Sequence, residues 1–244
     1  AAGARPVVAI YSTFLQRAYD QLIHDAALQK LKVILAIDRA GVVGEDGRTH
    51  QGVFDVAFLH TVPNIHVYAP TYYDELSDNL SDCIEGEDRL YAVRYPRGKE
   101  LFRPAGYKLS GKPFGVYGST ESQVAVVTYG RLFSFAYEAM QTLAESGIKC
   151  KIVKLNRIIP LDPEVVRLLL NCKTVFFFEE GVRAGGVAEC LGSALVEAGF
   201  SGRYVMRCIE DGFIRHAPMF RILEHLGLDK AGMLRTIREN LKQK

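Results

Sequence analysis

The sequence predicts an α/β protein made of two doubly wound domains. Along most of its 244 residues, short apolar runs alternate with segments of helical periodicity, a pattern typical of parallel sheets covered by helices on both faces. A stretch rich in glycine and proline, residues 96–123, interrupts the alternation, as expected of a linker between domains. We therefore predict a first domain over residues 1–113, which includes the start of the linker, and a second domain over residues 114–244.

In the first half, short apolar runs predict buried strands, and the segments between them have the period of an amphipathic helix. Residues 17–29, for example, place Leu22, Ile23, Ala26 and Ala27 on one helical face. The predicted order is strand 7–11, helix 17–29, strand 33–38, glycine-rich loop 39–52, short helix 54–60, strand 65–69, helix 72–84 and strand 91–95.

The second half repeats this pattern. From Leu132 to Leu143 the apolar residues recur at i, i+3, i+4, i+7, i+8 and i+11, which predicts a helix that Gly147 ends. Pro163 suits the first turn of another helix. The predicted order is strand 124–128, helix 132–143, strand 150–155, helix 163–170, strand 175–178, glycine-containing loop 179–186, helix 187–198, strand 204–209 and helices 219–226 and 230–241.

Composition excludes several classes of protein. The formal net charge of +2 argues against a nucleic-acid coat or a polybasic membrane binder. No apolar run approaches the roughly 18 residues of a membrane span, and the start lacks the pattern of a signal peptide, so we expect a cytoplasmic protein. The five cysteines show no C-x-x-C spacing, which predicts buried free thiols and neither disulfides nor a zinc site. We predict no metal site within this sequence.

Active sites in such sheets lie beyond the carboxyl ends of the strands, and the first candidate segment follows strand 7–11. There Tyr11 and Phe14 offer aromatic faces to a planar heterocycle, and Arg17 offers a cation to an anion. A cation at a helix start is mildly disfavoured by the helix dipole, which hints at a partner anion. The alternative is that both rings belong to the core and that Arg17 is solvated.

The second candidate is the loop that follows strand 33–38. Its glycines allow close approach of the backbone to a ligand, although their spacing fits neither the Rossmann nor the P-loop pattern. The loop also carries Arg39, Asp46 and His50, and histidine titrates near neutral pH and can transfer protons. A purely structural surface loop is the less favoured alternative.

Two further segments lie at predicted strand ends. Arg94 and Arg97 flank the end of strand 91–95, and their planar guanidinium groups suit a phosphate or a carboxylate; surface salt bridges are an equally good interpretation. Residues 179–186 precede a helix whose N-terminus could bind an anion. A tight turn within a subunit interface is at least as good an explanation of that segment.

Taken together, these segments resemble one family, the 1-deoxy-D-xylulose-5-phosphate synthases, which are relatives of transketolase that use thiamine diphosphate. The resemblance covers nearly the whole sequence, and transketolases and 2-oxo-acid dehydrogenase β subunits do not carry these motifs together. The motifs are YSTFLQRAYDQ at 11–21, DRAG at 38–41, THQG at 49–52, VRYPRG at 93–98, EEG at 179–181, GG at 185–186, DGFI at 211–214 and LGLDKAGM at 226–233.

The resemblance implies a fold and a reaction. The two domains would be a transketolase-like pyrimidine-binding domain, with a parallel or mixed sheet, and a transketolase C-terminal-like domain. The family condenses pyruvate with D-glyceraldehyde 3-phosphate to 1-deoxy-D-xylulose 5-phosphate, with loss of CO2, and so supplies precursors of isoprenoids, thiamine and pyridoxal. Thiamine diphosphate and magnesium are the implied cofactors, and a homodimer is the implied assembly.

The resemblance also assigns roles to residues. Phe14 would stack on the aminopyrimidine ring of the cofactor, with Tyr11 beside it. Arg39 and Arg97 would bind the substrate phosphate, and Arg17 would border the same pocket. The catalytic residues would be His50 and Asp46, close to the reacting carbons and the substrate hydroxyls.

Some parts of the family pattern are missing from this sequence. The cofactor-activating glutamate lies in an Ala-Glu-Gln-His motif, which the resemblance places just before Ala1, and the large N-terminal domain would hold the magnesium and diphosphate ligands. The sequence also lacks an initiator methionine and a Gly-Asp-Gly motif followed by a distant Asn. We therefore expect a C-terminal portion of such a synthase that is inactive without its N-terminal domain.

Two alternatives remain open at this point. The chain could be a natural β-type subunit of a split transketolase or 2-oxo-acid dehydrogenase-like enzyme, completed by a second polypeptide. It could also be a non-catalytic module that binds phosphate esters through Arg39 and Arg97.

Overall fold

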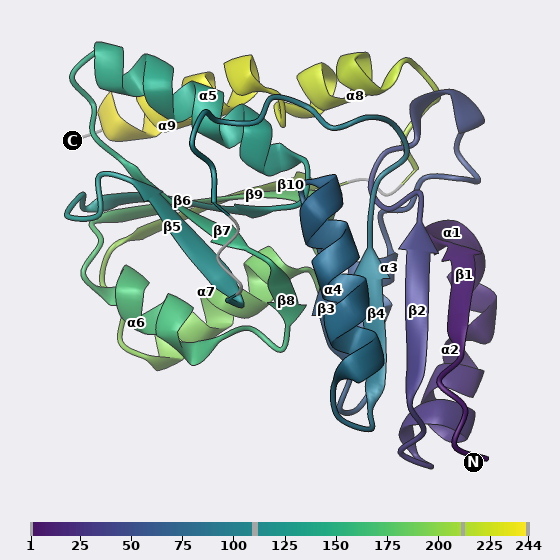
Figure 1. The fold of residues 1–244 in the computed structure, drawn as a ribbon. Coiled ribbons are helices and arrows are strands. Elements are labelled where there is room, and N and C mark those ends of the chain that lie inside the picture. The colour runs from purple at the N-terminus through teal and green to yellow at the C-terminus, as the bar shows by residue number, and fades with distance from the viewer. Residues whose placement is uncertain (1, 109–111, 211–212, 243–244) are drawn as a thin grey trace.

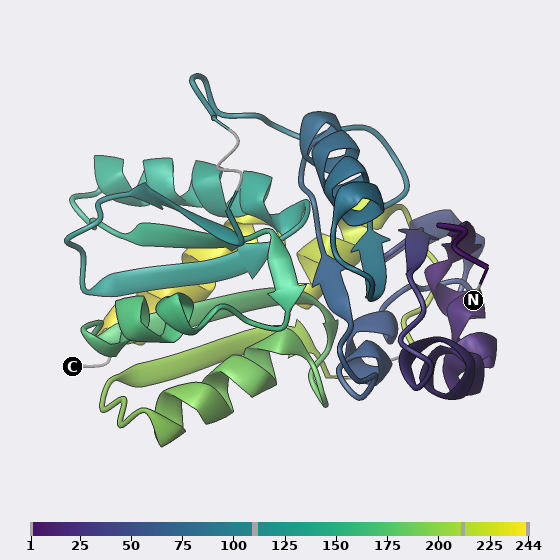
Figure 2. The ribbon, with the colours of Figure 1, turned by 60° about the horizontal axis from the view of Figure 1, so that its bottom comes forward.

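The computed structural model describes residues 2–108, 112–210 and 213–242. Within these ranges the strands form two sheets that lie side by side, each with its own helices (Figure 1). The two chain ends lie at opposite ends of the molecule, and the residues that follow β4, up to 108, arch over one side (Figure 2). No helix in the described part is both long and apolar enough to cross a membrane.

The first sheet has the strand order β1-β2-β4-β3-β8. Its first four strands are parallel, and β8 pairs antiparallel with β3. The strands are β1 (Val7–Tyr11), β2 (Val33–Asp38), β3 (His66–Tyr68), β4 (Leu90–Arg94) and β8 (Arg157–Ile159). The helical segments of this half are α1 (Ser12–Leu15), η1 (Gln16–Ala18), α2 (Tyr19–Gln21), η2 (Leu22–Ala27), η3 (Gly44–Asp46), α3 (Asp55–Leu59) and α4 (Tyr73–Glu85).

The second sheet has the strand order β10-β9-β6-β7-β5, and only its edge strand β5 is antiparallel among the described strands. Helices α5 and α9 cover one face, and α6 and α7 cover the other (Figure 1). The strands are β5 (Phe114–Gly118), β6 (Val124–Tyr129), β7 (Lys151–Leu155), β9 (Thr174–Val182) and β10 (Arg203–Ile209). The helices are α5 (Leu132–Glu145), α6 (Pro163–Leu170), α7 (Val187–Glu197), α8 (Met219–Leu226) and α9 (Lys230–Lys242).

The predicted α/β architecture is confirmed, with four corrections to its elements. The predicted linker 96–123 contains β5, and β8 was not predicted at all. Both are short edge strands that form only because β7 and β3 offer them a partner, which local sequence does not show. The helix predicted over 17–29 starts at Ser12 and is divided into short α, 3-10 and π segments that end at Ala27. Strand β9 extends to Val182 and so includes part of the loop predicted over 179–186.

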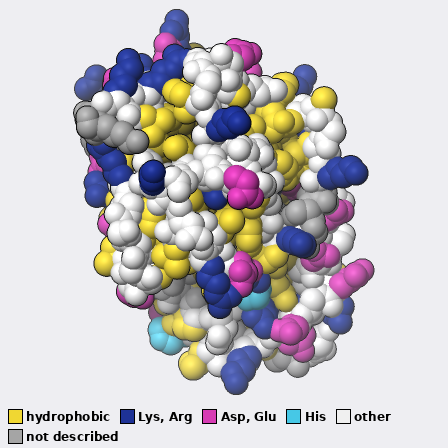
Figure 3. All heavy atoms as spheres, turned by 90° about the vertical axis from the view of Figure 1, so that its left-hand side faces the viewer, with side chains coloured by type: hydrophobic (Ala, Val, Ile, Leu, Met, Phe, Trp, Pro, Cys, Tyr) yellow, Lys and Arg dark blue, Asp and Glu magenta, His cyan; other side chains and the backbone are white. Residues whose placement is uncertain are grey.

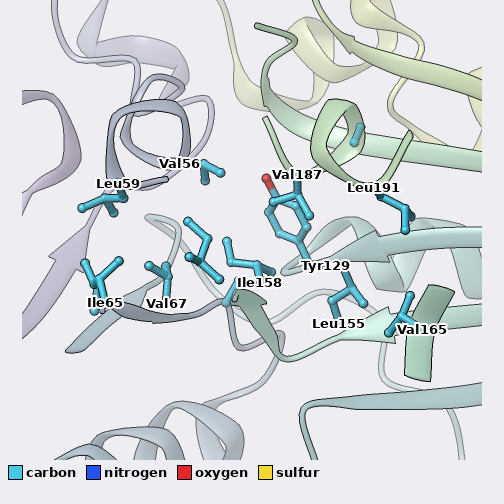
Figure 4. Packing of buried hydrophobic residues seen from close by; sticks show 14 of the residues in the cluster. Val56, Leu59, Ile65, Val67, Tyr129, Leu155, Ile158, Val165, Val187 and Leu191 are labelled. Carbon is cyan, nitrogen blue, oxygen red and sulfur yellow. The ribbon is translucent and has the colours of Figure 1, made fainter. Parts of the chain in front are cut away.

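One hydrophobic cluster runs from the first sheet into the second (Figure 4). Val56, Leu59 and Val67 come from the first half, and Tyr129 and Leu191 come from the second. Ile158 on β8 lies between these groups in Figure 4. The two halves therefore share a buried apolar interface and are not joined by the linker alone. The domain boundary between residues 113 and 114 stays a prediction.

The exposure of the cysteines and the distribution of surface charge agree only in part with what the composition led us to expect. All five cysteines are free, but Cys190 is exposed, so the prediction of buried thiols is wrong for that residue.

On the face in Figure 3, lysines and arginines gather toward the top, the level at which α5 and α9 lie in Figure 1. The near-balance of charge thus hides local unevenness. That the chain binds no nucleic acid stays a prediction.

His66, at the start of β3, should make stability depend on pH. Burial, and then the nearby Arg89 and Arg157, lower the pKa of His66 from 6.5 to about 4. Arg89 donates a hydrogen bond from Nη1 to His66 Nε2 at 2.7 Å, which requires that nitrogen to be unprotonated. Because the unfolded chain binds the proton more readily, stability should fall as the pH drops from about 6.5 to about 4.

The variant His66→Gln keeps an acceptor for Arg89 but cannot titrate. Its urea midpoint, measured at several pH values between 7 and 4, should fall less steeply than that of the unmodified chain. His24→Gln is the matched control, because the His24 side chain is 61% exposed. Equal slopes for the His66 variant and the unmodified chain would contradict this account.

Candidate active site

Three neighbouring strands of the first sheet have their carboxyl ends on the same side of that sheet. Strands β1, β2 and β4 are neighbours and parallel. Tyr11 lies opposite Asp38, and Ile37 lies opposite Arg94. The segments that leave these strands therefore begin next to one another, as the sequence predicted for the candidate residues.

The aromatic part of the site comes from the segment after β1. The rings of Tyr11 and Phe14 stack with centroids 5.7 Å apart and planes inclined by 19°. His50, from the glycine-rich loop, meets Phe14 edge to face at 5.4 Å, and the Arg17 guanidinium lies 5.8 Å from the centre of the same ring. Phe14 is 38% exposed, so part of this aromatic residue is accessible to solvent at the strand end.

The cationic part of the site is built by Arg39 and Arg97. Asp46 forms ion pairs with both arginines, one through each carboxylate oxygen. The distance from Arg97 Nη1 to Asp46 Oδ1 is 2.6 Å. The Arg39 guanidinium also lies 4.1 Å from the centre of the Tyr11 ring. Two guanidinium groups from separate segments therefore converge on one carboxylate, beside the aromatic pair.

The backbone of the glycine-rich loop holds these side chains in place. Arg39 has a left-handed conformation with φ of 58°, and its N–H donates to Asp38 Oδ1 at 2.6 Å, a local bond that helps to stabilise such a conformation. At the base of the loop, Gly41 and Gly52 exchange backbone hydrogen bonds of 2.6 and 2.8 Å. A Cβ atom on Gly52 would lie 2.1 Å from the Arg39 carbonyl oxygen, so this close approach requires glycine.

His50 is held by its neighbour in the loop. Thr49 Oγ1 and His50 Nδ1 are 2.9 Å apart, and Thr13 Oγ1 donates to the Thr49 carbonyl at 2.8 Å. The loop is thereby connected to the segment after β1. The other ring nitrogen, Nε2, is the one through which His50 can contact a ligand.

The structure brings together the seven residues to which the family resemblance assigns roles. Contacts connect the aromatic residues, the arginines and both polar loop residues into one group: Tyr11, Phe14, Arg17, Arg39, Asp46, His50 and Arg97. Their roles stay predictions, because proximity alone does not assign chemistry.

Arg94 is not part of this group. Its side chain is 5% exposed and binds the Asp55 carboxylate with two hydrogen bonds, from Nε at 2.8 Å and from Nη2 at 3.1 Å. A buried, bidentate pair of this kind leaves no free guanidinium for a ligand. The surface salt bridge weighed for Arg94 is therefore also wrong, because the pair is buried.

The segment 179–186 does not offer its helix to an external anion. Glu179 accepts hydrogen bonds from the N–H groups of Val187 and Ala188, at 2.9 and 2.8 Å, at the start of α7. Tyr129 also donates its hydroxyl to Glu179 at 2.7 Å. Burial raises the pKa of Glu179 despite these bonds. The chain itself thus fills the site at which an anion was considered.

Sequence reasoning assigned no role to three polar residues that bind the backbone of the glycine-rich loop, one of which, Gln51, lies within the loop and in the quoted THQG motif. Gln51 accepts from the Val43 N–H at 2.8 Å, while its own Nε2 is buried without a partner among the described residues. Arg131 and Glu180 bind the peptide groups of Val42. A weak signal existed, because Arg131 lies three residues after the end of the predicted strand 124–128 and Glu180 lies in a quoted motif. Neither feature indicates a contact with the other half.

Comparison with known protein families agrees with this architecture. Residues 1–100 match the family model described as the transketolase pyrimidine-binding domain, and residues 116–233 match the one described as the transketolase C-terminal domain. These two matches together cover most of the chain and identify its class as that of the transketolases. The chain belongs to the transketolase family.

Within that family, the predicted resemblance to one group of enzymes is confirmed by sequence identity. The chain is 40% identical over 253 residues to the 1-deoxy-D-xylulose-5-phosphate synthase of Caldanaerobacter subterraneus subsp. tengcongensis, covering 99% of the chain and 39% of that protein. It is 38% identical over 240 residues to the synthase of Dehalococcoides mccartyi, covering 96% of the chain and 37% of that protein. The chain thus spans less than two fifths of the length of these relatives.

Solved structures share the fold. A protein described as a split gene transketolase, in an inactive beta4 tetramer, superposes with a TM-score of 0.83 at 23% identity, covering 99% of this chain and 78% of that one. The transketolase of Campylobacter jejuni superposes with a TM-score of 0.78 at 19% identity, covering 96% of this chain and 35% of that one.

The site residues fit one end of the cofactor that the family implies. An exposed aromatic ring stacked on a second ring, as in Phe14 and Tyr11, suits a flat heterocycle such as the aminopyrimidine of thiamine diphosphate. The described residues therefore suit the pyrimidine ring of the cofactor. They do not include a group of three or more His, Cys, Asp or Glu side chains that could hold the metal ion of a metal-bound diphosphate.

The ion pairs of Asp46 lead to a prediction about anion binding. An external anion must compete with the Asp46 carboxylate for Arg39 and Arg97. The variant Asp46→Asn removes that negative charge, and we expect it to bind inorganic phosphate about three- to tenfold more tightly, as charge-assisted bonds to both arginines become free.

Titration calorimetry of the unmodified chain and the variant with inorganic phosphate measures this change. Asp20→Asn is the control, because Asp20 pairs with His24 on the surface. An Asp46 variant that binds phosphate no better than the control would contradict the competition.

Proposed function

We propose that this chain is the pyrimidine-binding and C-terminal part of a thiamine diphosphate-dependent synthase. The reaction is the condensation of pyruvate with D-glyceraldehyde 3-phosphate to 1-deoxy-D-xylulose 5-phosphate, with loss of CO2. The observation that carries the proposal is the convergence of Arg39 and Arg97 next to the stacked rings of Tyr11 and Phe14. The identity of about 40% to synthases of this name supports the choice of substrates.

The chain's residues would bind both the cofactor and the substrate. Phe14 and Tyr11 would hold the aminopyrimidine ring by stacking, with Arg17 at the border of the pocket. When bound, thiamine diphosphate supplies the chemistry that removes CO2 from pyruvate and joins the remaining carbons to the aldehyde. The role of the protein is to place the groups that surround this chemistry.

The arginine pair would select the second substrate. Guanidinium groups bind phosphate through paired hydrogen bonds in a fixed plane. Arg39 and Arg97 come from the ends of different strands, so together they can contact different oxygens of one phosphate. Pyruvate has no phosphate, and its binding should depend much less on these residues.

His50 and Asp46 would interact with the hydroxyl and carbonyl oxygens of the substrates. His50 and Phe14 pack edge to face, which supports a position of the His50 ring beside the proposed cofactor. A histidine there can hold or move a proton through Nε2. Asp46, once phosphate has displaced it from the arginines, can accept a hydrogen bond from a substrate hydroxyl.

The proposal also includes the parts that the chain does not supply. The magnesium and diphosphate ligands, and the glutamate that activates the cofactor, would come from an N-terminal domain of the same enzyme. The assembly would be a cytoplasmic homodimer. We expect the chain to have no synthase activity without that domain.

A β-type subunit of a split enzyme is the second candidate. The chain covers 78% of the split gene transketolase chain but only 35% of the Campylobacter jejuni transketolase. In that case the N-terminal domain would be a separate polypeptide. Co-purification with a second chain from the native source would favour this candidate over a single long enzyme.

Activity measurements separate these functions from simple binding. The chain is assayed with pyruvate, D-glyceraldehyde 3-phosphate, thiamine diphosphate and Mg²⁺, alone and after mixing with the N-terminal portion of a synthase relative. Product formed only in the mixture supports the proposal. Product from the chain alone would refute the need for a second part, and phosphate-ester binding without turnover in any mixture would favour a non-catalytic module.

The variant Arg97→Ala tests the assignment of the phosphate site. We expect the affinity for D-glyceraldehyde 3-phosphate to fall by about tenfold or more, since a charge-assisted bond contributes roughly 1.5–3 kcal/mol, while pyruvate binding changes little. Arg167→Ala on α6 is the control, because that side chain is 68% exposed and pairs only with its neighbour Glu164 among its described ion pairs. Equal losses for both substrates in calorimetric titrations would refute the assignment.

A further inference from the structure

The second half of the chain binds both backbone polar groups of one residue in the glycine-rich loop, Val42. The N–H of Val42 donates to Glu180 Oε1 at 2.7 Å, and the carbonyl of Val42 accepts from Arg131 Nη2 at 2.6 Å. Arg131 and Glu180 also bind each other, with Arg131 Nε donating to Glu180 Oε2 at 2.9 Å. We call this pair the loop clamp.

The loop clamp is anchored in the centre of the second sheet. Arg131 follows the end of β6, and Glu180 lies on the neighbouring strand β9. Their side chains are 6% and 7% exposed. Because both groups are charged and buried, each is costly to leave without its partner. The clamp is therefore expected to have one well-defined geometry.

The loop is shaped to receive the clamp. Gly41 has φ of +83°, and a Cβ atom there would lie 2.6 Å from the Glu180 carboxylate. The backbone bridge between Gly41 and Gly52 closes the loop at the same level. Gly44, further along, packs against the segment before α8, where a Cβ atom would lie 3.0 Å from the Ala217 carbonyl oxygen. The second half thus contacts the loop at two places.

Val42, the residue that the clamp binds, lies in the sequence between residues proposed to bind the substrate. Arg39 precedes Val42 by three residues, and Asp46 follows it by four. Neither Arg131 nor Glu180 contacts Phe14 or Arg97 through any interaction described above. The bonds to Val42 connect the clamp to the site through the backbone of the loop. Arg131 also lies beside Pro96 and Gly98, which flank Arg97.

We propose that Arg131 and Glu180 are positioning residues that hold the loop 39–52, and with it Arg39, in the geometry that binds the phosphate of the substrate. The C-terminal domain is then a functional part of the site, although it contributes no residue that touches substrate. This inference rests on the proposed function for the role of Arg39. The contact between the clamp and the loop stands independently of it.

The competing explanation is that the pair only joins the two halves. The chain offers a matched control for that explanation in Glu75 on α4. Glu75 is also buried, pairs with Lys154 on β7, and accepts from a backbone N–H, that of Thr71, at 2.6 Å. It therefore resembles Glu180 in burial and bonding, but it does not contact the loop.

Amide hydrogen exchange of the full chain, followed by mass spectrometry, tests the proposal. In Glu180→Ala we expect the amides of residues 41–43 and 52 to exchange about tenfold faster or more, because a buried bond that holds them is lost, while β2 stays protected. In Glu75→Ala we expect lower thermal stability with unchanged exchange in the loop. Equal loop exchange in the two variants, or none above the unmodified chain, would overturn the proposal.

A second variant covers the case in which Glu180→Ala does not fold. Replacing the pair by Arg131→Met and Glu180→Met removes both buried charges, which in other proteins is often neutral or stabilising. We expect this double variant to fold and still to show fast exchange in the loop. Normal protection of the loop in a folded double variant would mean that apolar packing suffices and would overturn the proposal.

The affinity for inorganic phosphate tests whether the clamp affects the site. We expect the double variant to bind phosphate at least about threefold more weakly than the unmodified chain, although Arg39 and Arg97 are intact, since a mobile arginine must be ordered on binding. Unchanged affinity together with fast exchange would overturn the positioning role. If the unmodified chain binds no phosphate, the proposed function fails, while the exchange data still decide whether the clamp holds the loop.

Discussion

The parallel pairing of β1, β2 and β4 is the constraint on which the candidate site depends. Parallel strands present their carboxyl ends at one edge, so Tyr11, Asp38 and Arg94 end their strands close together. The segments that follow carry the stacked rings, the glycine-rich loop and Arg97. A change of register in any of the three strands would turn its last side chain to the other face of the sheet and separate these groups. The chemistry of the site is therefore a consequence of strand direction and register.

Buried charges fix the positions of the elements around that edge. Arg94 binds Asp55, Lys154 binds Glu75, and Arg131 binds Glu180, and each of these side chains is at most 7% exposed. Such pairs are weak evidence for stability, because desolvation offsets most of their attraction, but each is satisfied in only one arrangement. The pair of Glu75 and Lys154 joins α4 to β7, and the pair of Arg131 and Glu180 joins the second sheet to Val42. The two halves are thereby fixed relative to each other by polar contacts as well as by the shared apolar cluster.

Much of the fold and the membership of the candidate site could be predicted from the sequence. Strands with strong apolar runs, such as β2 and β6, were placed within a residue of their observed bounds, because local pattern decides such elements. The short strands β5 and β8 were missed, because they exist only where a neighbouring edge accepts them. Phe14, Arg39 and Arg97 were found because they follow predicted strands. Arg131 and Glu180 were not found as contacts of the loop, since their partner Val42 lies far away in the sequence.

The sequence by itself determined the α/β class, the family resemblance and the residue types at the strand ends, because these follow from periodicity and from motifs within short segments. Only the tertiary structure decided how each of these cations is buried and paired. Both Arg94 and Arg97 lie at a strand end in the sequence pattern, and only the family resemblance selected Arg97. In the structure Arg94 is buried against Asp55, while Arg97 is 48% exposed and shares Asp46 with Arg39. It also decided that Glu179 fills the start of α7 and that Glu180 holds the loop. The physical reason is that burial and pairing depend on groups brought together from distant segments, which no local pattern records.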